Sequence, residues 1–122
     1  MKKAVNKPLT NSTFKAAVKM CLEHDPVNGL FNVEPYGKMP DWDVSNVTDM
    51  SFTFENASDF NANISKWDVS QVIDMEYMFY LATSFNQDLS KWDVSNVTEH
   101  LLFDKNTPAW TLPKLNFNPL NK

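Results

Sequence analysis

The sequence has no arginine, two glycines, one cysteine and no long apolar run. All 11 basic residues are lysine, which disfavours any site built on the bidentate clamps that arginine forms with phosphates or carboxylates. Gly29 and Gly37 are too few for a glycine-rich phosphate loop, and Cys21 alone cannot form an intrachain disulfide. No stretch reaches the ~18 apolar residues of a membrane span.

The length of 122 residues predicts a single domain, residues 1–122, with one hydrophobic core. The formal net charge of -4 argues against direct nucleic-acid binding. The segment 1–8 contains lysines but is not followed by an apolar stretch, so no signal peptide is visible. A cytoplasmic location is therefore expected if Met1 is the native start.

A 25-residue repeat dominates the sequence. Trp42, Trp67 and Trp92 are spaced 25 residues apart, and each begins the phrase WDVS. We define repeat 1 as residues 42–66, repeat 2 as 67–91 and repeat 3 as 92–114. A constant offset of 25 predicts vertical ladders, formed by the three tryptophans, by Met50 with Met75, and by Phe54 with Phe79.

A period of 25 is typical of leucine-rich repeats, in which each repeat holds one strand and one helical segment. In repeat 2, Val72, Met75, Phe79 and Ala82 have the spacing of one face of a short helix. The apolar residues of 64–69 predict one or two short strands. The predicted fold is a small α/β leucine-rich-repeat-like solenoid of about three repeats.

The two ends of the chain have the patterns of caps. The helical spacing of Phe14, Ala17, Val18, Cys21 and Leu22 predicts an amphipathic helix from about residue 13 to 23. We therefore divide the domain into an N-terminal capping helix and loop (1–38), the repeats (39–104) and an irregular C-terminal cap (105–122), which includes the last residues of repeat 3. The residues expected to cover the last repeat are Trp110, Leu112, Leu115 and Phe117.

The phrases WDVSNVTDM and SFNQDLSKWDVSNVT resemble the BspA-like leucine-rich-repeat family, and the likeness extends from Phe14 to Trp110. The resemblance implies a repeat fold and a non-enzymatic role in binding proteins or matrix. It also implies a cell-surface or secreted location. Glycine is common late in the family's helical segment, where this chain has Asn56 and Leu81.

Residues that could support catalysis are scarce. Cys21 lies on the predicted core stripe, where cysteine is usually a small buried hydrophobe. Cys21 and His24 lie three residues apart, but two ligands do not make a metal site. We therefore predict no catalytic residues, no metal and no cofactor.

Acidic residues recur at two positions of the repeat. Between residues 41 and 104 there are 12 acidic residues and 2 lysines. A structural interpretation is that aspartates form Asx turns or cap backbone amides. The alternative is an acidic face that mimics nucleic acid, as in a phage-encoded inhibitor of a host defence system. The acidic columns are Asp43, Asp68 and Asp93, and Asp49, Asp74 and Glu99.

An aromatic column is the other candidate site. On a helical wheel Tyr77 points away from the core arc, and its counterparts are Phe52 and Leu102, with Tyr80 beside it. Glu55 and Glu76 flank this column. We therefore predict a non-catalytic protein-binding module that contacts a protein partner, or a second copy of the chain, through this surface. A purely structural or assembly module is a second alternative.

Overall fold

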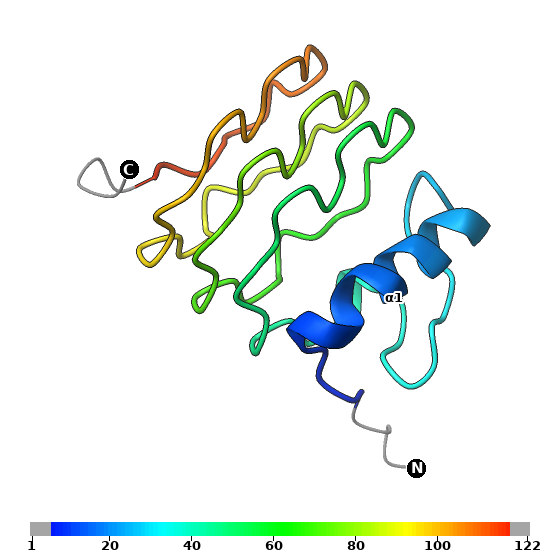
Figure 1. The fold of residues 1–122 in the computed structure, drawn as a ribbon. Helices are drawn as coiled ribbons and strands as arrows, with labels where there is room; N and C mark the ends of the chain where they lie inside the picture. The colour runs from blue at the N-terminus through cyan, green and yellow to red at the C-terminus, as the bar shows by residue number, and fades with distance from the viewer. Residues whose placement is uncertain (1–5, 118–122) are drawn as a thin grey trace.

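The computed structural model describes residues 6–117 and contains one α-helix, α1 (Asn11–His24), and one short 3-10 turn, η1 (Met39–Asp41), within that range (Figure 1). No named strand forms among these residues; three isolated bridges join Val33 with Gly37, Asp49 with Asp74, and Asp74 with Glu99. The predicted α/β class is thus right for the N-terminal helix and wrong for regular strands. Residues 1–5 and 118–122 of the predicted caps lie outside the described range.

The predicted capping helix is confirmed as α1, which begins two residues earlier and ends one residue later than expected. At its start the Thr10 amide donates to Thr13 Oγ1 at 2.9 Å, which holds the first turn. The buried face includes Phe14, whose ring meets Trp42 edge-on at 6.5 Å and Trp67 at 5.7 Å. The helix therefore covers the first repeat at one end of the molecule (Figure 1).

Successive repeats lie side by side, and residues 25 apart stack on each other (Figure 1). The ring centroids of Trp42 and Trp67 are 6.2 Å apart, and those of Trp67 and Trp92 are 6.5 Å apart, with nearly parallel planes. Phe54 and Phe79 stack in the same way at 5.5 Å. The tryptophan and phenylalanine ladders predicted from the offset are confirmed, and a buried aromatic cluster forms the core.

Backbone hydrogen bonds link the repeats. In repeat 1, alternate amides from Met50 to Asn56 donate to carbonyls of repeat 2, and amides from Met75 to Leu81 donate likewise to repeat 3. All of these bonds have N···O distances of 2.7–3.0 Å. Each such amide is therefore satisfied by the neighbouring repeat and not by a carbonyl four residues back in its own segment.

The short helix predicted from the spacing of Val72, Met75, Phe79 and Ala82 is wrong, although all four side chains are buried. The segment consists of turns, because two residues per repeat have left-handed backbone with φ between 51° and 63°. A right-handed helix cannot pass through such residues. They occupy two columns: Phe52, Tyr77 and Leu102, and Asn56, Leu81 and Asn106.

The left-handed backbone predicts a residue-specific cost at Asn56, whose φ is 62° and whose side chain is exposed. Asn56→Ala is expected to lower the free energy of unfolding by about 1 kcal/mol, because alanine tolerates this conformation worse than asparagine. Asn56→Gly is expected to be at least as stable as the parent. Urea unfolding measures both, and Asn46→Ala, at an exposed site with no left-handed backbone, is the matched control. Equal stability of the alanine and glycine variants would contradict this backbone assignment.

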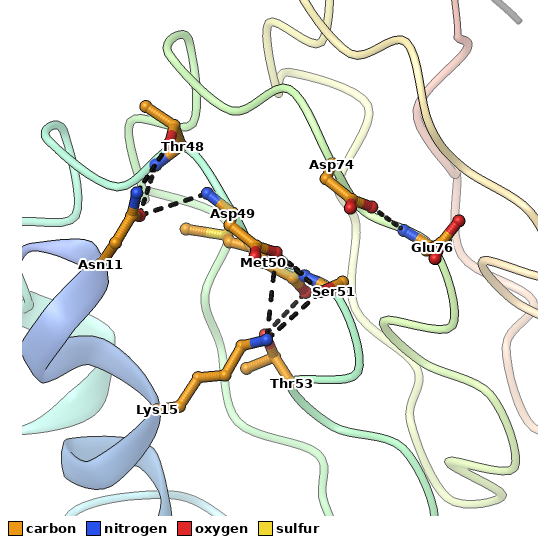
Figure 2. A network of polar contacts seen from close by, with 9 residues as sticks. All are labelled: Asn11, Lys15, Thr48, Asp49, Met50, Ser51, Thr53, Asp74 and Glu76. Carbon is orange, nitrogen blue, oxygen red and sulfur yellow. Dashed lines mark hydrogen bonds and ion pairs between the residues drawn. The ribbon is translucent and has the colours of Figure 1, made fainter.

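Side chains cap the repeats at both ends. Asn11 of α1 accepts the amides of Thr48 and Asp49 with Oδ1, at 2.9 and 3.3 Å, and so replaces the carbonyl of a missing earlier repeat (Figure 2). At the other end Trp110 and Leu115 are buried and Phe117 packs against the core, as predicted. Leu112 was expected to join them but is 42% exposed, and its amide donates to Asn86 Oδ1 at 2.9 Å.

Candidate interaction surfaces

The aromatic column lies outside the core cluster. The rings of Phe52 and Tyr77 are stacked 4.9 Å apart, with an interplanar angle of 11°. Tyr80 meets Tyr77 edge-on at 5.2 Å. Phe52 is 45% exposed, and Tyr77, Tyr80 and Leu102 are partly exposed. The structure therefore places Phe52, Tyr77 and Leu102 at one repeat position, with Tyr80 packed beside Tyr77, and the left-handed turns and ladder bonds of neighbouring repeats hold them there.

Both predicted rim residues, Glu55 and Glu76, are partly exposed. The amide of Glu76 donates to Asp74 Oδ1 at 3.0 Å, which fixes the backbone at this rim residue (Figure 2). In the turn segments of repeats 2 and 3, sequence reasoning missed two large apolar side chains that are also exposed, Ile73 at 48% and Leu101 at 61%. Each is an apolar residue at a repeat position where the other repeats have a polar one. This difference between repeats is visible in the sequence and could have identified both residues.

The first acidic column forms Asx turns, as its structural interpretation predicted. Oδ1 of Asp43, Asp68 and Asp93 accepts both the amide and the hydroxyl of the serine two residues later. The hydroxyl contacts are 2.6–2.7 Å long and the amide contacts 3.0 Å. The same motif recurs at Asn63 and Asp88, which the sequence reasoning did not identify.

The second acidic column has mixed roles. Asp49 Oδ1 binds the amide and hydroxyl of Ser51 at 2.9 and 2.7 Å and lies 3.9 Å from Lys15 Nζ of α1 (Figure 2). Partial burial opposes ionisation of Asp49, but Ser51 and Lys15 outweigh it and lower the pKa of this carboxyl. Asp74 caps only the Glu76 amide, and Glu99 is exposed. Asp49 and Asp74 therefore fix the turns that begin the aromatic segments of repeats 1 and 2.

Acid is expected to weaken the fold through these turns. The hydroxyl and amide of Ser70 lower the pKa of Asp68, and those of Ser90 lower the pKa of Asp88. A carboxyl with a lowered folded-state pKa stabilises the fold above its ordinary pKa of about 3.9, and that contribution is lost as the pH falls through the folded value. The urea concentration at the unfolding midpoint should thus decrease as the pH is lowered below about 4. The double variant Ser70→Ala/Ser90→Ala should show a smaller decrease. An unchanged pH profile in this double variant would contradict the assignment.

Cys21 and His24 do not converge on one site. Burial raises the pKa of the Cys21 thiol, which points to the Gly29 carbonyl at 3.3 Å. The His24 ring stacks on Phe31 at 3.9 Å, and its Nδ1 lies 3.0 Å from the Met20 carbonyl oxygen. Among residues 6–117 no group of three or more histidine, cysteine or acidic side chains could hold a metal ion. Within the same range, no helix is long and apolar enough to cross a membrane.

Comparison with known protein families identifies the family of the repeat region. Residues 27–116 match the family described as Mycoplasma protein of unknown function, DUF285, which is the BspA-like repeat family. The chain belongs to this family, and the resemblance seen in its WDVS phrases is confirmed. No curated protein and no solved structure matches the chain.

Proposed function

We propose that this member of the DUF285 family is a leucine-rich-repeat-like solenoid that binds a protein partner without catalysis. The contact surface is the aromatic column of Phe52, Tyr77, Tyr80 and Leu102, and Glu55 and Glu76 form its rim. The stack of Phe52 on Tyr77, outside the core and 4.9 Å apart, is the observation that carries the proposal. Aromatic side chains at this exposure provide large apolar contact area with few rotatable bonds.

The backbone supports this role because it holds the column rigidly. The amides of Phe52 and Tyr77 donate to the next repeat at 3.0 and 2.9 Å, so the two turns cannot move independently. Both residues adopt left-handed φ, near 60°, which bulky side chains disfavour by roughly 1–2 kcal/mol each. A preformed apolar surface loses little conformational entropy on binding, which favours affinity.

The acidic-inhibitor alternative uses the face of Asp43, Asp68 and Asp93. The carboxylate oxygen Oδ1 of each is engaged by the serine two residues later, so one of its two oxygens already serves the fold. A partner of this face must be basic, and its affinity must fall steeply with salt. A partner of the aromatic column should be far less sensitive to salt.

The test compares how strongly the parent protein and two double variants bind a partner protein captured from the native host. Phe52→Ser with Tyr77→Ser is expected to weaken binding by at least about 30-fold, because each aromatic supplies hot-spot contact. Melting should change little, because neither side chain belongs to the core cluster. Asp68→Asn with Asp93→Asn is the matched control, since asparagine retains the Asx acceptor and removes the charge.

Each result of this comparison has one interpretation. If only the asparagine variant loses binding, and the parent's affinity collapses with salt, the acidic face is the contact surface. If no partner is captured and sedimentation shows that the serine variant dissociates an oligomer of the parent, the column joins copies of the chain. If the serine variant unfolds, the column belongs to the core and the proposal fails.

A further inference from the structure

The C-terminal end of the repeat stack has a row of backbone donors. In repeats 1 and 2 every second amide of the aromatic segment donates to the next repeat. The equivalent amides in repeat 3 have the same left-handed positions, with φ of 51° at Leu102 and 63° at Asn106. Among residues 6–117 they have no hydrogen-bond partner. This open row consists of the amides of His100, Leu102, Asp104 and Asn106.

A hollow of about 540 Å³ lies against the open row and is lined by all four of its residues. Phe103 and Phe117 give it an apolar wall, where the His100 ring stacks on Phe117 at 4.1 Å. His100 Nε2 is buried and finds no hydrogen-bond partner among the described residues. Lys105 and Lys114 also line the hollow, and Lys114 Nζ bonds Asp104 at 2.8 Å. The site thus combines main-chain donors, a ring nitrogen without a partner among residues 6–117, the exposed Lys105 and the ion pair of Lys114 with Asp104.

We propose that the open row binds an extended acidic segment of a partner protein, which adds to the stack as the next layer. Its alternate backbone carbonyls accept the four amides, as the carbonyls of repeat 3 accept those of repeat 2. Its carboxylates face Lys105 and Lys114, beyond the mainly acidic repeats. Parallel addition continues the geometry already present between Asp49, Asp74 and Glu99.

The direction of the hydrogen bonds argues against a second copy as the occupant. If a second copy approached with its own C-terminal end, its open row of amides would face this open row. Hydrogen-bond donors do not pair with donors. Its other end is covered by α1, whose Asn11 and Lys15 contact Thr48, Asp49 and Ser51 (Figure 2). An extended segment of a different chain has no such restriction.

Hydrogen exchange followed by NMR tests the open row in the intact protein. The four amides of the row are expected to exchange quickly, whereas those of Met75, Tyr77, Phe79 and Leu81 are expected to be protected. Equal protection of the two sets in the free protein would overturn the proposal, because the row would already be covered.

The probe is a synthetic peptide of residues 74–81, DMEYMFYL, with blocked ends, because this acidic segment accepts the amides of repeat 1. At saturation it should slow exchange of the four amides by about tenfold or more. Lys105→Glu should weaken its binding several-fold, whereas Lys66→Glu, an exposed lysine outside the hollow, should not.

The aromatic column gives an independent control. The Phe52→Ser and Tyr77→Ser variant should bind this peptide as the parent does, because the row uses main-chain atoms of repeat 3. If the peptide instead perturbs Phe52 and Tyr77 and leaves the four amides unprotected, it binds the column and the proposal is wrong. Absence of binding at millimolar peptide would also overturn it.

Discussion

Replacing Phe79 with alanine is expected to lower the free energy of unfolding by about 3–5 kcal/mol. Phe79 is fully buried, and its ring lies 5.5 Å from that of Phe54, 4.5 Å from Phe85 and 5.2 Å from Trp110. Truncation removes aromatic contacts with the preceding repeat, with its own repeat and with the C-terminal cap. The surrounding main chain is fixed by ladder bonds, so the cavity cannot collapse easily.

Urea unfolding of parent and variant measures this cost, and a domain of this size typically has 5–15 kcal/mol of stability from which to lose it. Phe52→Ala is the matched control, because Phe52 lies two residues before the equivalent core position, Phe54, but is 45% exposed. Its cost should stay within about 1 kcal/mol. A Phe79→Ala cost as small as that of the control would show that the stacked rings do not carry the core.

The repeat register could be predicted from the sequence because it depends only on the period. A constant offset of 25 residues places Trp42, Trp67 and Trp92 in one ladder, whatever the local conformation of each repeat. The helix α1 was also predictable, since the apolar spacing from Phe14 to Cys21 is that of one buried helix face.

The conformation inside each repeat could not be predicted in the same way. Buried residues at spacings of three and four arise in a helix, but they arise here from consecutive turns with left-handed residues at Tyr77 and Leu81. The signal was weak, because only Asn56 and Asn106 are residue types that favour left-handed backbone. The amides are satisfied by the next repeat, and such non-local pairing is invisible in a single segment.

The two candidate surfaces, the aromatic column and the open row, differ in whether they are formed by side chains or by the main chain. The sequence pointed to Phe52 and Tyr77 because aromatic residues recur off the core stripe, although the left-handed turns, and not a helix face, hold them there. The open row at His100 to Asn106 is made of main-chain amides, which every residue except proline carries. Only the hydrogen-bond pattern of the whole stack reveals that these amides have no partner among residues 6–117.

The centre of the tryptophan ladder is expected to be the second critical position. Trp67 stacks between Trp42 at 6.2 Å and Trp92 at 6.5 Å, and Phe14 of α1 meets it at 5.7 Å. Its indole Nε1 donates to the Met39 carbonyl at 2.8 Å. Trp67 therefore joins the capping helix, the preceding segment and both neighbouring repeats through one side chain.

Trp67→Ala should cost about 3–5 kcal/mol, and Trp67→Phe only about 1–2 kcal/mol, because phenylalanine keeps a ring in the stack and loses the indole donor. The Met39 carbonyl also accepts the Trp42 amide at 3.1 Å, so the phenylalanine variant leaves no acceptor wholly unpaired. Trp92→Ala provides the comparison within the ladder, since Trp92 stacks on Trp67 alone among the tryptophans of the described residues. Its cost should be smaller by about 1 kcal/mol, the value of one aromatic contact. Urea unfolding of the three variants decides the matter: equal costs at Trp67 and Trp92 would mean that stacking between repeats adds nothing to simple burial of each ring.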